Sequence, residues 1–126
     1  MRNTANRIPF GVSPYKIYVA LLTQTGSSAP TAEVLESSIG EIVWARSSAG
    51  TYTATLAGAF TASKTVVLMG TETASPSAGL YNTPKAVKTS ADIITVLTSR
   101  LDVAGGAVGI VDDILSATEI EIRVYP

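Results

Sequence analysis

Five carboxylates near the carboxyl end of the chain come closest to a chemical site: Asp102, Asp112, Asp113, Glu119 and Glu121. Carboxylate oxygens could bind calcium, and a pair could supply the acid and base of glycoside hydrolysis. However, the spacing matches no EF-hand loop, and adjacent aspartates near glycines are typical turn formers. Glu119 and Glu121 lie about 6–7 Å apart on one face of a predicted strand, which suits pairing with lysines across strands. We therefore favour turns and surface charges over a metal site or a catalytic pair.

A second candidate is the segment 58–65, which differs by one residue from the phosphate-binding pattern G-x-x-x-x-G-K-[ST]. Ser63 stands where that pattern requires glycine, and the following VVLMG is typical of a strand rather than of the helix that phosphate binding needs. The segment 105–109 lacks the strand–turn–helix context of a dinucleotide site, and no serine lies in a G-x-S-x-G elbow. Both segments are predicted to be turns or connections.

The composition removes several classes of chemistry, because the chain contains no cysteine and no histidine. Zinc, copper, haem and iron–sulfur centres lose their usual ligands, and the commonest general base at neutral pH is missing. Nine basic and ten acidic residues give a net charge of -1, which argues against the clustered basic surface that nucleic-acid binding requires. We expect a protein that is not an enzyme, with no catalytic residue, cofactor, metal, nucleic-acid partner or small-molecule substrate.

Targeting signals and surface charge suggest where the chain works. Residues 1–10 carry charge without an apolar stretch behind it, and no apolar run approaches the ~18–20 residues that span a bilayer. We therefore expect no membrane contact and synthesis in a cytoplasm. Only 15% of the residues are charged, which is sparse for the surface of a free monomer. The chain is either an ordinary low-charge β protein or, as we favour, a protein whose surface is partly covered by neighbouring subunits.

Short apolar or alternating segments separated by turn residues predict the elements. The predicted strands cover residues 15–23, 31–37, 41–46, 51–56, 64–70, 86–89, 92–98, 107–111 and 119–125. Short strands with turn signals every 8–15 residues are typical of a sandwich, a jelly roll or a partly closed barrel. We predict an all-β fold: a single antiparallel β-sandwich or jelly-roll-like domain over residues 14–126, preceded by an extended N-terminal arm over residues 1–13.

Two segments give the clearest local signals. Residues 42–56 predict a β-hairpin in which Gly50 adopts a positive φ and Tyr52, Ala54 and Leu56 share one face. Trp44 is the single tryptophan, and we expect it to anchor the core beneath this hairpin. Residues 119–125 alternate strictly, with three aliphatic residues facing inward and three charged residues facing outward.

The candidate partner contacts lie in two segments without periodicity. The N-terminal arm is either disordered or ordered by lying on a neighbour, and we favour the second because Ile8 and Phe10 give it apolar side chains to bury. Leu80 and Tyr81 lie in the stretch 71–84, whose length and two prolines predict a contact-making loop. These four residues are our predicted contact sites.

Aromatic residues offer an alternative function. A sugar-stacking platform could be formed by Tyr15, Tyr18, Trp44, Tyr52, Tyr81 and Tyr125, with Tyr81 the best candidate for exposure. Scattered aromatics in a sandwich more often belong to the core or the sheet surface. A glycan- or receptor-binding β-sandwich module therefore remains the alternative to a structural protein.

Two stretches of the sequence resemble a known group of proteins. They are residues 15–65, YKIYVALLTQTGSSAPTAEVLESSIGEIVWARSSAGTYTATLAGAFTASKT, and residues 117–126, ATEIEIRVYP. These stretches, about half of the chain, resemble small β-rich structural proteins of tailed bacteriophages; residues 72–89 depart from that pattern. The resemblance implies a virion component made in the host cytoplasm: a capsid decoration (cement) protein, a head-fibre protein or a tail-associated protein. Its implied partners are further copies of itself, as a homo-oligomer such as a trimer, and virion proteins such as the major capsid protein. The resemblance transfers no functional residue.

Overall fold

The computed structural model describes residues 14–70, 79–103 and 105–126. These residues form nine strands and no helix, so none of them lies in a helix able to cross a bilayer. The strands are β1 (Lys16–Thr23), β2 (Thr31–Ser37), β3 (Val43–Ser48), β4 (Thr51–Thr55), β5 (Thr65–Met69), β6 (Leu80–Lys88), β7 (Ile93–Asp102), β8 (Ala107–Ile110) and β9 (Thr118–Val124).

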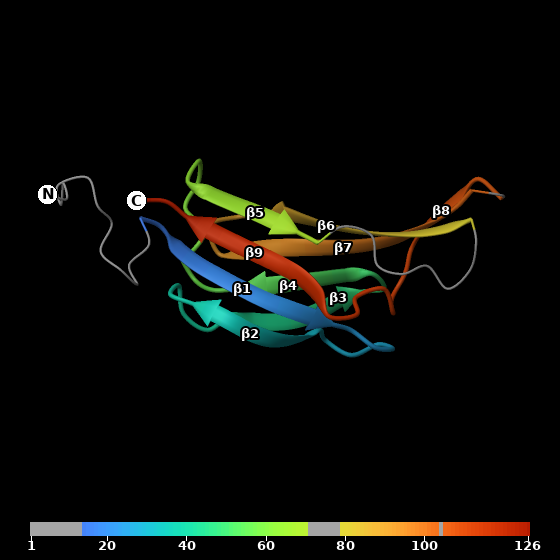
Figure 1. Ribbon diagram of the computed structural model, residues 1–126, viewed down its shortest axis with the longest axis horizontal. Coiled ribbons are helices and arrows are strands. Elements are labelled where there is room, and N and C mark those ends of the chain that lie inside the picture. The colour runs from blue at the N-terminus through green and yellow to red at the C-terminus, as the bar shows by residue number, and fades with distance from the viewer. Residues whose placement is uncertain (1–13, 71–78, 104) are drawn as a thin grey trace, which may run out of the picture.

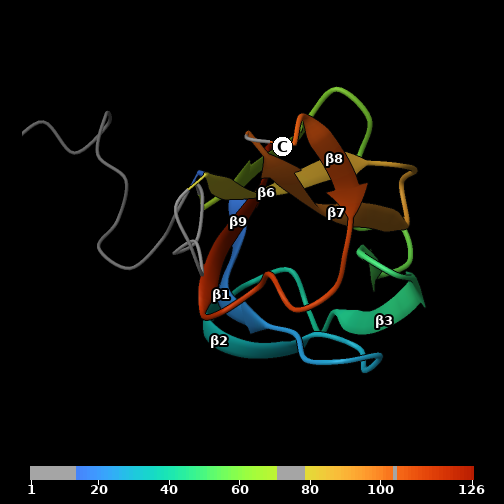
Figure 2. The same cartoon turned by 90° about the vertical axis from the view of Figure 1, so that its right-hand side faces the viewer.

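Two antiparallel sheets pack face to face and confirm the predicted all-β sandwich. One sheet has the strand order β2-β1-β9-β5, and the other has the order β3-β4-β7-β6 with β8 added beside β7. The chain passes from one sheet to the other after β2, β4, β5 and β8, while its remaining connections are hairpins within a sheet. Figure 2 shows the strands of the two layers nearly end-on.

The core lies between the central strands of the two sheets, β1 and β9 facing β4 and β7. Alternation places Ile120, Ile122 and Val124 of β9 inward, as predicted. The largest fully buried side chains include Tyr18, Tyr52 and Phe60. Each fully buried aliphatic side chain contributes roughly 1.5–3 kcal/mol, so this layer is the main source of stability. The two sheets thus pack most closely along their middle strands, and the core is less completely covered at their edge strands.

The predicted hairpin is confirmed and ends where β7 changes its partner. Gly50 has a φ of +66°, and the hairpin register slips at Arg46–Ser48 beside it. The first half of β7 pairs with β4 as far as Thr51–Leu97, and its second half pairs with β8. The Gly50 carbonyl accepts a hydrogen bond from Thr98 N at this junction. β6, β7 and β8 consequently extend past the end of β4, on the right in Figure 1.

The two long sides of the sandwich differ. On one side the edge strands β5 and β6 contact each other. On the other side lie β2 and β3, both at the bottom of Figure 1, and within the described residues each has a strand partner on one edge alone. The first and last described residues lie together at one end, because Lys16 pairs with Val124.

The segment predicted as a long loop is partly a strand. Leu80 and Tyr81 begin the nine-residue strand β6, which also contains Pro84 and extends far beyond the short strand predicted at residues 86–89. Pro84 is compatible with this strand because proline, which lacks an N–H, is tolerated in an edge strand such as β6. Tyr81 is exposed, as predicted, although on a strand instead of a loop.

Trp44 corrects a second prediction. Its side chain packs against the core from the rim and is half-buried, whereas Tyr18, Tyr52 and Phe60 occupy the centre. β3 is the outermost strand of its sheet, so an inward-facing residue there is covered on one side only. The predicted arm with Ile8 and Phe10 lies outside the described residues.

Candidate functional site

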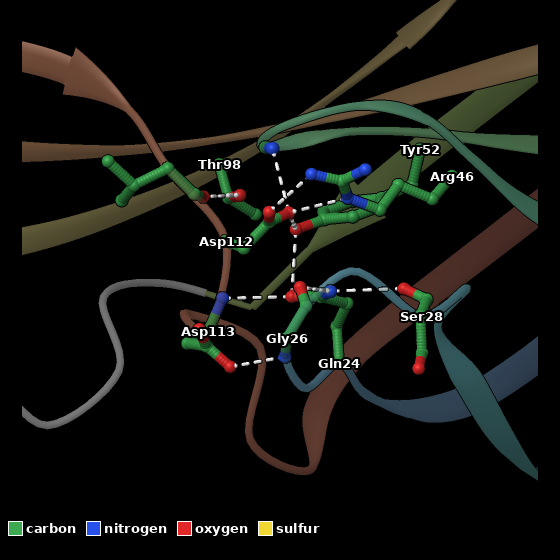
Figure 3. Close-up of polar contacts among 10 residues, drawn as sticks. Gln24, Gly26, Ser28, Arg46, Tyr52, Thr98, Asp112 and Asp113 are labelled. Atoms are coloured by element: carbon green, nitrogen blue, oxygen red, sulfur yellow. Dashed lines mark hydrogen bonds and ion pairs between the residues drawn. The ribbon is translucent and has the colours of Figure 1, made fainter.

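Three loops meet at the end of the sandwich opposite the chain ends, and a set of polar side chains joins them (Figure 3). We call this set the loop cluster; its members are Gln24, Arg46, Tyr52, Asp112 and Asp113. Gln24 follows β1, Arg46 and Tyr52 flank the β3–β4 turn, and the two aspartates follow β8. The cluster therefore ties together connections from both sheets.

Asp112 is the centre of the loop cluster. Its Oδ1 accepts hydrogen bonds from Tyr52 Oη (2.7 Å), Gly50 N (2.9 Å) and Arg46 Nε (3.2 Å). Its Oδ2 accepts a bond from Arg46 Nη2 at 2.7 Å, so the guanidinium binds the carboxylate with two nitrogens. The Arg46 guanidinium first, and then the Gly50 and Tyr52 donors, hold the pKa of Asp112 well below its usual range. Asp112 is therefore a stable anion.

Tyr52 is the buried partner of this anion. Its hydroxyl lies 2.7 Å from Asp112 Oδ1 and 2.9 Å from Gln24 Oε1, but it carries one proton. We infer that the hydroxyl donates its hydrogen bond to Asp112, because that distance is shorter and that acceptor is charged. Burial, and next the bond to Asp112, raises the pKa of Tyr52 to about 12. The phenol accordingly stays neutral at physiological pH.

Both polar atoms of the Gln24 side chain have hydrogen-bond partners. Its Oε1 accepts a bond from Asp113 N at 2.8 Å, and its amide nitrogen donates to the carbonyls of Gly26 (2.7 Å) and Ser28 (3.0 Å). Asp113 Oδ1 in turn accepts a bond from Gly26 N at 2.7 Å. A half-buried network in which each of these groups has a partner rigidifies loops and offers no poised acid or base. We interpret the loop cluster as a structural latch.

The five carboxylates singled out from the sequence are not brought together. Asp112 and Asp113 belong to the latch, Asp102 accepts a bond from Gly105 N at the far end of β7, and Glu121 forms an ion pair with Arg123 on its own strand. Within residues 14–70, 79–103 and 105–126, no group of three or more acidic residues is placed to hold a metal ion. Segment 58–65 forms a turn followed by β5, as predicted, so no helix begins there.

A groove opens between the edge strands β2 and β3. Its volume is about 630 Å³, and its lining comprises Tyr18, Pro30, Ala32, Val34, Ser37, Gly40, Glu41, Ile42 and Trp44. Ala32 and Val34 lie opposite Leu22 and Ala20 of β1, so they belong to the core-facing side of the sheet. Val34 is nevertheless 49% exposed. The groove is thus an uncovered edge of the core.

The floor and rim of the groove have distinct polarity. At the floor, Trp44 Nε1 donates a hydrogen bond to the Tyr18 hydroxyl at 3.2 Å. On the rim Glu41 lines the opening, whereas Glu33 and Glu36 are exposed on the outer face of β2, opposite Leu21 and Val19 of β1. No basic side chain of the described residues lines it. An apolar channel beside an acidic outer strand face suits an apolar, basic peptide.

A second hollow lies at the end where the described chain begins and finishes. Its volume is about 760 Å³, and Pro14, Lys16, Glu36 and Lys64 are among its lining residues. Tyr15 and Tyr125 also line it, with ring centroids 5.0 Å apart, and the Arg123 guanidinium lies 5.0 Å from the Tyr15 ring. We call this hollow the terminal pocket.

No family model, curated protein or solved structure matches this chain. The loop cluster is internally satisfied, whereas the groove and the terminal pocket are open to a partner.

Sequence reasoning found some of these features and missed others. Tyr81 was correctly predicted to be exposed, and Leu80 beside it is half-buried. The latch was missed, because its contacts join residues 28, 60 and 66 positions apart. The groove was missed because it depends on which strands lie at the sheet edges. A usable signal was the unusual pair Val34–Leu35, two adjacent apolar residues in a strand whose other residues are small or acidic.

Proposed function

We propose that this chain is a non-enzymatic structural subunit that assembles with further copies of itself. In line with the resemblance to structural proteins of tailed bacteriophages, we place it in a virion as a capsid decoration, head-fibre or tail-associated component. The major capsid protein is then the expected heterologous partner.

Strand β2 carries the proposal. Six of its seven residues are exposed, on both faces of the strand, and Val34 and Leu35 are 49% and 59% exposed. Val43 on the neighbouring edge strand β3 is 64% exposed. Adjacent apolar side chains on an unpaired edge are a template for association with another chain. This edge needs a protein partner to become a buried surface.

A second apolar surface supports the same function. Tyr81 and Leu101 are direct neighbours across β6 and β7, and both are exposed, as are Val103 and Ile110 nearby. Tyr81, Leu101 and Ile110 lie on the part of β6, β7 and β8 that extends past β4 (Figure 1), and Val103 directly follows β7. A subunit with apolar patches at its edge and at its tip can contact different neighbours with each.

The test of self-assembly is the native mass of the full chain, measured by light scattering over a hundredfold range of concentration. We expect a small oligomer with a fixed number of copies, as closed symmetry gives. A monomer at every concentration would contradict self-assembly. As a specificity control, Tyr81→Ser and Leu101→Ser should leave the fold intact by circular dichroism while removing apolar area at the tip.

The terminal pocket favours a second function, the binding of a glycan. Tyr15 and Tyr125 offer ring faces, while Lys16, Lys64 and Glu36 offer hydrogen-bonding groups around them. A few polar groups beside aromatic faces are typical of small-molecule sites. A glycan-array screen of the wild type and of Tyr125→Ala tests this directly: binding that disappears in the variant supports the glycan function, and no binding by the wild type rejects it.

A further inference from the structure

We propose that the groove between β2 and β3 binds residues 1–13 of a second copy, which add to the edge of β2 as a strand. The inference rests on the proposed function, because it names the segment through which copies of the chain join. It assigns Ile8 and Phe10 to the apolar channel. Arg7, which would point to the other face of an extended strand, is assigned to Glu33 and Glu36 on the outer face of β2.

The groove has the features of an acceptor for an extended peptide. Within the described residues β2 pairs with β1 alone, so the hydrogen-bonding groups on its other edge have no strand partner. The side chains of Ala32, Val34 and Trp44 line the channel beside that edge. Strand addition supplies backbone hydrogen bonds along the edge and pockets for alternate side chains. The groove supplies both.

Charge argues against β2 of a second copy as the occupant. Antiparallel pairing of two β2 strands would bring Glu33 and Glu36 of one copy close to the same residues of the other, and like charges across strands are destabilising. The occupant should therefore be basic as well as apolar.

Residues 1–13 match this requirement. They contain Arg2 and Arg7, no acidic residue, and the apolar run Ile8-Pro9-Phe10. The added strand would be the new edge of the sheet, where Pro9 is tolerated. Thirteen extended residues reach at most about 45 Å, which is enough to cross from one subunit to the groove of the next.

The layout of the two hollows favours a second copy over the chain's own segment. Residues 1–13 join the body at Pro14, which lines the terminal pocket. The β2–β3 connection divides this pocket from the groove, since Ser38 and Ile39 line the pocket while Gly40 and Glu41 line the groove. A chain would have to pass over its own connection to fill its own groove, whereas a neighbour approaches from solvent.

Engineered cysteines test the contact, because the natural chain has none. Phe10→Cys and Val34→Cys are combined in the full chain, which is then oxidised with dithiodipyridine and run on a non-reducing gel. We expect covalent dimers and higher ladders that disappear on reduction. The matched control combines Phe10→Cys with Val66→Cys, an exposed valine on β5, and should stay monomeric on the gel. A disulfide within one chain, or equal ladders from both pairs, would overturn the inference.

A charge exchange gives a second, independent readout. Arg7→Glu should raise the dissociation constant of the oligomer at least tenfold, and Glu33→Lys should do the same. The double variant should recover much of the wild-type mass. Absence of recovery would argue against the pairing of this segment with the outer face of β2. If the wild type is monomeric, the proposed function itself fails; if the wild type is oligomeric but neither test links the segment to the groove, only this inference fails.

Discussion

The loop cluster and the groove both lie where the two sheets stop covering each other, but they end the core in opposite ways. At the loop cluster Asp112 accepts four hydrogen bonds, from Arg46, Tyr52 and Gly50, so the chain closes itself with polar contacts. At the groove Val34 and Trp44 face an opening, and the edge of β2 has no strand partner among the described residues. One boundary is complete within the chain and contributes stability; the other is incomplete and, in our proposal, contributes assembly.

The largest expected effect breaks the closed boundary at Gly50. A Cβ at Gly50 would lie 2.7 Å from Val111 N and 2.8 Å from Thr98 O, and φ is positive there. We expect Gly50→Ala to lower the free energy of unfolding by ~3 kcal/mol or more, from overpacking and backbone strain together. Gly58→Ala is the matched control: its φ is also positive, but nothing lies within 4 Å. Urea denaturation of both variants checks this, and equal losses would contradict the close packing at Gly50.

The next largest loss of stability is expected when one hydroxyl is removed from the loop cluster. Tyr52→Phe deletes the donor to Asp112 and should cost about 1.5–3 kcal/mol, as hydrogen bonds to charged groups do. The control is Tyr18→Phe, since Tyr18 is similarly buried but its hydroxyl accepts one neutral bond from Trp44. Its loss should be nearer about 1 kcal/mol. A larger loss in Tyr18→Phe than in Tyr52→Phe would show that the latch is not the stronger contact.

The pH dependence of stability isolates the anion. The folded-state pKa of Asp112 is lowered, so its contribution is fully present above the unfolded pKa of about 3.9 and is lost as the pH falls further. Tyr52 acts at the alkaline end of the pH range. Its pKa is raised to about 12, so its contribution to stability is present below about pH 10 and is lost between pH 10 and pH 12.

The variant Asp112→Asn should be less stable than the wild type at pH 7 but should lose less stability on acidification. Thermal melts between pH 2 and pH 7 measure both, and parallel curves for variant and wild type would contradict the assignment.

The smallest expected effect is at the open boundary. Val34→Ala should change the unfolding free energy of the monomeric state by less than about 0.5 kcal/mol, because the side chain is half exposed. Val96→Ala, at a fully buried position of β7, should cost about 2 kcal/mol. The two variants should rank the other way in native mass: Val34→Ala should weaken the oligomer, whereas Val96→Ala should not. Urea denaturation at low protein concentration, followed by light scattering, separates the two readouts.

The sequence predicted features that depend on local pattern. Alternation defined β9 with Ile120 and Ile122 inward, and Gly50 marked the hairpin turn. The sequence did not predict the full length of β6, because proline at position 84 is tolerated only in an edge strand. It failed likewise for Trp44, whose burial depends on the order of strands in its sheet. Local residues cannot show sheet order, so the extent of β6 and the position of Trp44 could not be predicted from the sequence alone.

The candidate site shows the same division. Exposure of Tyr81 followed from its polar, proline-containing surroundings. The latch did not, since Gln24, Tyr52 and Asp112 are distant in sequence and each, taken alone, resembles an ordinary surface or core residue. Contacts of high sequence separation become visible only when the fold is known.

The central claim, that the β2–β3 edge is a docking surface, is tested most directly by amide hydrogen exchange of the full chain at low and high protein concentration. We expect the amides of β2, with those of β3 beside them, to become protected as concentration rises, while those of β4 and β7 in the core change little. Unchanged exchange of β2, or protection that rises only on β6 and β8, would contradict it.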